Sequence, residues 1–151
     1  MHSYSTIDER SCVNISLDDV LPNKSATIER CIARIKEEYE KCPKLDNYTH
    51  VDAMTLNIER ACQAAIDMAM HIVADNHLGI PQNSADAFEL LKRNGIVDKS
   101  LSHSLKAMTG FRNVAVHGYR ELDSSILRHI AEKGIRDLIL FCRALQINIV
   151  D

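Results

Sequence analysis

The side chains best suited to chemistry in this 151-residue sequence lie in one segment, residues 110–119. It contains Arg112 and His117, and Asn113 directly follows the arginine. A guanidinium donates paired hydrogen bonds to phosphate and keeps its charge at any physiological pH. An imidazole has an unperturbed pKa of about 6.5, so it can accept or release a proton near neutrality. The pair is therefore a minimal but sufficient set for metal-free cleavage of RNA, in which the 2′-hydroxyl loses a proton and attacks the phosphate.

The spacing of these two residues favours a site shared between two copies of the chain. Arg112 and His117 are five residues apart, which is about 140° around an α-helix. They do not share one helix face, and Gly118 predicts that the helix ends just after the histidine. Two-fold pairing of two such helix ends would bring two arginines and two histidines into one cleft. We therefore predict a composite site in a homodimer, with one imidazole as base and the other as acid.

The elements that must position this segment are helices. Apolar residues recur at helical spacing, and no segment alternates convincingly at period two. The expected helices cover about residues 25–42, 49–76, 85–94, 98–117 and 124–145, with Asn23 or Ser25, Ser84, Asp98, and Asp123 or Ser124 as start signals. The pattern predicts an all-α fold, an antiparallel bundle of four main helices plus a short helix. Residues 1–22 are expected to form an irregular arm before a helical domain of residues 23–151.

Composition limits the class of protein. Hydrophobic residues make up 46% of the chain, and only 5 Gly and 3 Pro interrupt it, which suits one domain with long helices. The 5 cysteines show no CxxC spacing, so neither a zinc knuckle nor a redox motif is indicated. No stretch approaches the roughly 18–20 apolar residues of a membrane span, and the first ten residues do not resemble a signal peptide. We expect a soluble cytoplasmic protein without membrane contact.

The charge distribution is compatible with an RNA partner. The net charge is −3, but residues 1–91 carry 15 acidic and 8 basic residues, whereas residues 92–151 carry 6 acidic and 10 basic residues. Such asymmetry allows one basic face to meet phosphate. Lys106, Arg120 and Arg128 lie in the basic part and are candidates for contact with the RNA backbone.

At residues 112–119 the sequence resembles HEPN-domain ribonucleases, whose signature is an arginine, four residues and a histidine, with a polar residue after the arginine. Tyr119, two residues after His117, extends the resemblance to the HepT toxin family, which is encoded beside MNT-type nucleotidyltransferase antitoxins. Further similarity lies in residues 59–67, in residues 84–91 and at Asp123, so that it covers about residues 25–145. The resemblance implies a HEPN-like, all-helical homodimer.

The resemblance also implies roles for individual residues. It makes the chain a toxin and an endoribonuclease that needs no metal and no other cofactor, with Arg112 and His117 as the catalytic pair and Asn113 supporting them. The antitoxin of this family uses ATP to transfer AMP onto the tyrosine that corresponds to Tyr119. An added AMP would place a phosphate near Arg112 and obstruct RNA entry. Transfer RNA is the expected substrate.

Two other interpretations of the sequence stay open. The first is a catalytically silent HEPN-type module that only binds a nucleotidyltransferase, although such a module would not need both Arg112 and His117. The second is a metal-dependent hydrolase built on Asp67, His71 and Asp75, which follow one another at four-residue steps on one helix face. A polar stripe opposite the core is the simpler explanation of that spacing, because no second ligand-bearing helix is evident.

Overall fold

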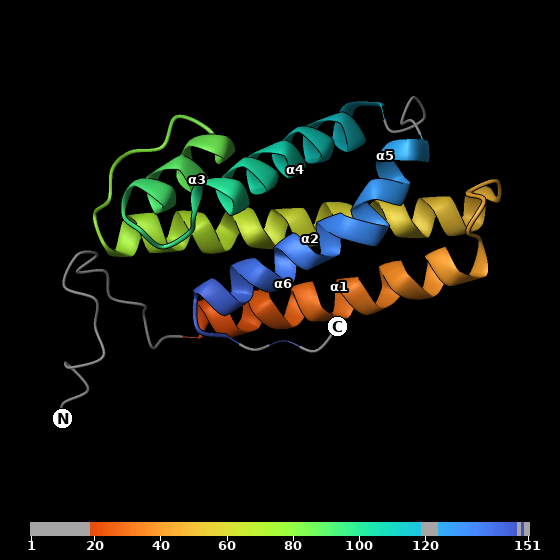
Figure 1. Cartoon of the computed structure of the whole chain (residues 1–151), viewed down its shortest axis with the longest axis horizontal. Coiled ribbons are helices and arrows are strands. Elements are labelled where there is room, and N and C mark those ends of the chain that lie inside the picture. The colour runs from red at the N-terminus through yellow and green to blue at the C-terminus, as the bar shows by residue number, and fades with distance from the viewer. Residues whose placement is uncertain (1–18, 119–123, 148, 150–151) are drawn as a thin grey trace.

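The computed structural model describes residues 19–118, 124–147 and 149, with only the backbone for residues 112–118. The four long elements are α1 (Val20–Lys41), α2 (Tyr48–Asp75), α4 (Lys99–Gly118) and a C-terminal element made of α5 (Ser124–His129), η3 (Ile130–Gly134) and α6 (Ile135–Ala144). The short helix α3 (Ser84–Arg93) precedes α4. The long elements run in alternating directions (Figure 1), and the described residues contain no strand. The predicted all-α bundle of four main helices and a short one is confirmed.

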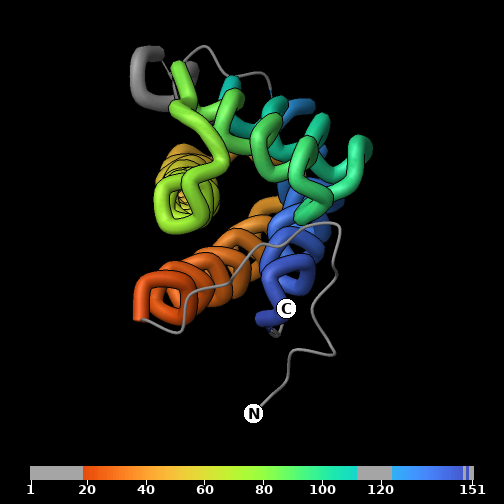
Figure 2. The backbone as a smooth tube through the Cα atoms, turned by 90° about the vertical axis from the view of Figure 1, so that its left-hand side faces the viewer, coloured from red at the N-terminus to blue at the C-terminus, as the bar shows by residue number. Residues whose placement is uncertain are grey.

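Helix α2 forms the centre of the core. It contacts α1, α3, α4 and α6; in the end view of Figure 2, α1 lies below it, α3 and α4 above it and α6 to its right. Four of its alanines are buried, Ala61, Ala64, Ala65 and Ala69, and their small side chains allow the neighbouring helices to approach closely. Its first turn is capped by Asn47, whose side chain accepts a hydrogen bond of 2.9 Å from the Thr49 N–H. None of the described helices is long and apolar enough to cross a bilayer.

Helix α1 begins earlier than the sequence suggested. It starts at Val20, so the expected start near Ser25 and the expected cap at Asn23 or Ser25 are wrong. Pro22 lies in the first turn, where its missing N–H has no intrahelical partner to lose. Leu21 is only 1% exposed, and its burial stabilises this additional turn. The last three residues assigned to the arm therefore belong to the helical domain, while residues 1–18 lie outside the described part.

The C-terminal element is not the single α-helix that was expected. A π-helical turn, η3, separates α5 from α6. Ile130 and Ile135 are both buried although they are five residues apart, a step of about 140° in an α-helix. The π turn pairs residues five apart and so keeps both side chains in the core. The five-residue gap in the apolar pattern was the available sequence signal.

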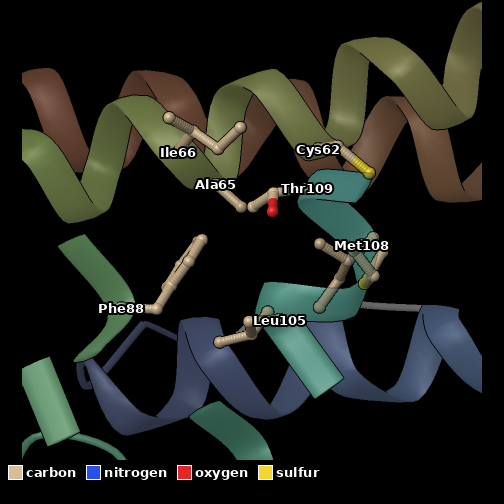
Figure 3. A pocket seen from close by; sticks show the side chains of 8 residues that line it. Cys62, Ala65, Ile66, Phe88, Leu105, Met108 and Thr109 are labelled. Atoms are coloured by element: carbon tan, nitrogen blue, oxygen red, sulfur yellow. The ribbon is translucent and has the colours of Figure 1, made fainter. Parts of the chain in front are cut away.

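Helices α3 and α4 are held by local caps and by a closed apolar seam. The α3 cap is Asn83, not Ser84, and its side chain accepts a hydrogen bond of 2.8 Å from the Asp86 N–H. The Asp98 carboxylate accepts one of 2.7 Å from the Leu101 N–H at the start of α4. Figure 3 shows side chains of α2, α3 and α4 meeting in this seam, among them Phe88. The seam is packed so closely that it has no room for a water molecule.

Candidate active site

Helix α4 carries the predicted catalytic pair in its last two turns. The helix runs to Gly118, so the backbone at Arg112, Asn113 and His117 is helical, as the sequence predicted. The side chains of these three residues lie outside the described part, as do Tyr119, Arg120 and Asp123. In the turn before the motif, Phe111 is buried in the core. That burial fixes the rotation of α4 about its axis at the point where the motif begins.

Lys106, a predicted RNA contact, is held by an acidic residue of the neighbouring helix. Its Nζ donates to the Glu89 carboxylate on α3, which also accepts from Lys92 at 3.1 Å and from Arg93 at 3.2 Å. The hydrogen bond from Lys106, then that from Lys92, lowers the pKa of Glu89 to about 2. One carboxylate thus meets three cations, and the surface around it keeps a net positive charge.

Arg128, another predicted RNA contact, is tied to the turn between α1 and α2. Its Nη2 donates to the Pro43 carbonyl oxygen at 3.2 Å. Close by, the Tyr39 hydroxyl of α1 donates to a Glu132 carboxylate oxygen of η3 at 2.5 Å, and this bond raises the pKa of the tyrosine. The two contacts join α5 and η3 to the end of the bundle at which α4 also ends (Figure 1).

The stripe of Asp67, His71 and Asp75 does not form a metal cluster. Asp67 accepts a hydrogen bond of 2.9 Å from Lys24 of α1 and another of 2.9 Å from Gln63 of α2 itself, so one oxygen serves the contact between α1 and α2 and the other a contact within α2. Within the described part of the chain, no three His, Cys, Asp or Glu side chains are grouped so that they could hold a metal ion. The observed pairing of Asp67 supports the simpler interpretation of the stripe.

Comparison with known proteins places this chain in a family. The family model described as ribonuclease HepT-like matches residues 28–145. The chain is 42% identical over 126 residues to the mRNA nuclease HepT of Shewanella oneidensis, an alignment that covers 83% of this chain and 95% of that protein. The chain belongs to the HepT-like ribonuclease family. The resemblance seen in the sequence is thereby confirmed, as is the expectation of a ribonuclease at the level of the family.

Solved structures agree with this assignment. This HepT-like chain matches a crystal structure of a toxin–antitoxin with AMP-PNP at a TM-score of 0.81 and 40% identity, over 85% of this chain and 98% of the other. It matches the tri-AMPylated HEPN toxin of Shewanella oneidensis in complex with an MNT antitoxin at a TM-score of 0.81 and 40% identity, over 86% and 98%. The HEPN-like fold is therefore confirmed.

Glu89 of this HepT-like chain was not predicted from the sequence as a functional residue. The residue is the common partner of three cations, including Lys106. Its contact with Arg93 has helical i, i+4 spacing and was visible in the sequence. Its contact with Lys106 joins two helices over 17 residues, and no local pattern predicts such a pair.

Proposed function

We propose that this chain is the toxin of a cytoplasmic toxin–antitoxin pair and cleaves RNA without a metal or other cofactor. The observation that carries the proposal is the 42% identity to a HepT nuclease over nearly its whole length, combined with an Arg-x4-His motif at the end of α4. That relative is named an mRNA nuclease, whereas transfer RNA was the expectation from the sequence. The substrate proposed here is RNA, and both kinds belong in the test.

The proposed reaction is a transesterification within the RNA. One His117 imidazole of a homodimer takes the proton of the 2′-hydroxyl, whose oxygen attacks the neighbouring phosphorus. The bond to the 5′-oxygen breaks, and the protonated His117 imidazolium of the other copy gives that oxygen a proton and becomes neutral. Arg112 stabilises the negative charge on the phosphate oxygens, and Asn113 supports the pair. The products are a 2′,3′-cyclic phosphate and a 5′-hydroxyl.

The decisive experiment compares expression of the wild type with Arg112→Ala and His117→Ala in a bacterial host. Of these three proteins only the wild type is expected to arrest growth, because loss of a catalytic group such as the proton-transferring histidine costs about 10²–10⁴-fold in rate. Arg136→Ala and His77→Ala are matched controls at exposed positions and should stay toxic. Equal toxicity of all variants, or loss of cleavage of purified RNA in EDTA, contradicts the proposal.

The partner of this toxin is proposed to be an MNT-type nucleotidyltransferase that uses ATP to place AMP on Tyr119. The support is the resemblance around Tyr119 and the similarity to a tri-AMPylated toxin in complex with an MNT antitoxin. Intact mass after incubation with such an antitoxin and ATP should rise for the wild type and not for Tyr119→Phe. Tyr48→Phe is the matched control, since Tyr48 is highly exposed. An equal mass gain in all three proteins contradicts modification at Tyr119.

A further inference from the structure

Two open hollows follow one another along α4. The first has a volume of about 500 Å³, and its lining includes Lys92, Lys99 and Lys106. The second has a volume of about 520 Å³ and lies between α4 and the C-terminal element. His103 and Ser104 of α4 line both hollows. The two hollows therefore adjoin along this helix, and together they are called the depression.

The first hollow is suited to phosphate. Its lining combines the three lysines with serine hydroxyls and His103, and it includes no carboxylate. Lys92 and Lys106 are held in place by Glu89, whereas Lys99 has no ion-pair partner among the described residues. Lysine ammonium groups and hydroxyls are common contacts for the phosphates of nucleic acids.

The second hollow is suited to a nucleoside. Its wall is apolar and includes Phe111, Ile126 and Ile130, and Ile126 is 44% exposed although it is a large aliphatic residue. His129 and Asp137 contribute polar groups to the same lining. Unpaired bases are commonly held by stacking on flat side chains, histidine included, and by hydrogen bonds to their edges. The wall also contains the π turn η3, a type of irregularity that is frequent at functional sites.

The depression leads toward the catalytic motif. Positions 103, 110 and 117 of α4 follow one another at seven-residue steps, and an α-helix drifts only about 20° per such step. At a rise of 1.5 Å per residue, the Cα positions of Lys106 and Lys99 lie roughly 9 Å and 20 Å along the helix from that of Arg112. These separations correspond to a few nucleotides of extended single-stranded RNA.

We propose that this depression is a binding track for single-stranded RNA outside the catalytic pair. The first hollow binds backbone phosphates through Lys99 and its neighbouring lysines. The second hollow holds one nucleoside that lies between these phosphates and the scissile bond. The proposal rests on the proposed ribonuclease function and adds the path of its substrate. The competing occupant of the second hollow is a second copy of the chain.

Gly110 offers a sharp way to block the track. A Cβ added at Gly110 would meet no atom within 4 Å, and Gly110 lines the second hollow, so Gly110→Leu places a side chain at its edge. Leucine also favours helix over glycine, and the variant should fold at least as well as the wild type. Lys99→Ala removes one phosphate contact from the first hollow. The matched controls are Ala33→Leu and Arg60→Ala, which lie at exposed positions of α1 and α2.

The primary test measures RNA binding in the His117→Ala background, with a fluorescent single-stranded oligonucleotide of mixed sequence. Lys99→Ala should raise Kd about threefold and reduce the slope of log Kd against log salt by about 0.7. Gly110→Leu should raise Kd about tenfold, as expected for loss of one stacked base. Both control variants should bind the oligonucleotide as tightly as the His117→Ala protein without a second substitution. Unchanged binding by both track variants overturns the proposal.

Two further readouts separate the proposal from its competitors. In the catalytically intact chain, Lys99→Ala should raise KM for the oligonucleotide and leave cleavage of a dinucleoside monophosphate unchanged, because only the longer substrate reaches the first hollow. Dissociation of the homodimer by Gly110→Leu assigns the second hollow to another copy and overturns the proposal. If the wild type cleaves no RNA, the proposed function fails, and the binding measurements still decide the track.

Discussion

The contact between Phe88 and Phe141 should carry a large share of the stability of the bundle. Phe88 of α3 is 1% exposed and Phe141 of α6 is fully buried. Their rings meet edge to face, with centroids 5.6 Å apart and an interplanar angle of 76°. Removal of a buried phenylalanine side chain costs about 3–5 kcal/mol. Phe88→Ala should therefore lower the free energy of unfolding by about 3–5 kcal/mol, because packed side chains surround it and cannot fill the space.

The free energy that the edge-to-face ring contact contributes beyond burial is measured with leucine variants, because leucine keeps most of the buried volume. A double-mutant cycle of Phe88→Leu and Phe141→Leu should give a coupling free energy of about 0.5–1.5 kcal/mol, the usual range for an edge-to-face pair. Urea unfolding followed by circular dichroism is the assay. It is run at one protein concentration, because the stability of the proposed homodimer depends on concentration.

The control for these variants is Ile80→Ala, at a residue that is 86% exposed, which should change the free energy of unfolding by less than about 0.5 kcal/mol. A cost below about 1 kcal/mol for Phe88→Ala would refute the reasoning, because it would mean that α3 does not depend on the seam. A coupling of zero would refute the contribution of the ring contact alone.

Three further predictions concern the elements around the site. The depressed pKa of Glu89 means that its carboxylate stabilises the fold above pH 4.5 and loses this effect as the pH falls toward about 2. The Tm difference between the wild type and Glu89→Gln should therefore shrink between these pH values. A constant difference would argue against the ion pairs. Burial raises the pKa of the Cys142 thiol to about 11, so iodoacetamide at pH 8 should alkylate this residue in urea and not in the native protein. Peptide mapping measures the labelling, and equal labelling in both conditions would contradict the burial of this thiol. Asn83→Ala should cost about 1 kcal/mol in urea unfolding because α3 loses its cap, whereas an equal cost for Gln82→Ala would show that the cap is not the cause.

Local signals explain which elements could be predicted from the sequence. Asp98 and Gly118 mark the limits of α4, and the structure gives Lys99–Gly118. The alanine-rich stripe of the longest helix likewise predicted its limits to within a residue. The start of α1 was misjudged because residues 1–22 show no sustained helical period, whereas the structure begins the helix at Val20 with Pro22 in its first turn, where proline is accepted.

Contacts between distant residues could not be predicted in the same way. The pairs Lys24–Asp67 and Glu89–Lys106 join different helices, and their formation depends on how the helices pack. The meeting of Arg112 and His117 across a dimer depends on a second copy, which the sequence of one chain does not define. That part of the site stays a prediction.

The π turn sets how the two halves of the C-terminal element face the second hollow and the core. Before it, Ile126 and His129 line the hollow and Leu127 is buried; after it, Leu138 and Phe141 fill the core and Asp137 lines the hollow. Deletion of one residue between Ile130 and Ile135 would restore an unbroken α-helix and rotate one half against the other by about 100°. A change in length at this point would therefore disrupt either the wall of the second hollow or the core packing. Relatives that keep both must keep the extra residue of the π turn.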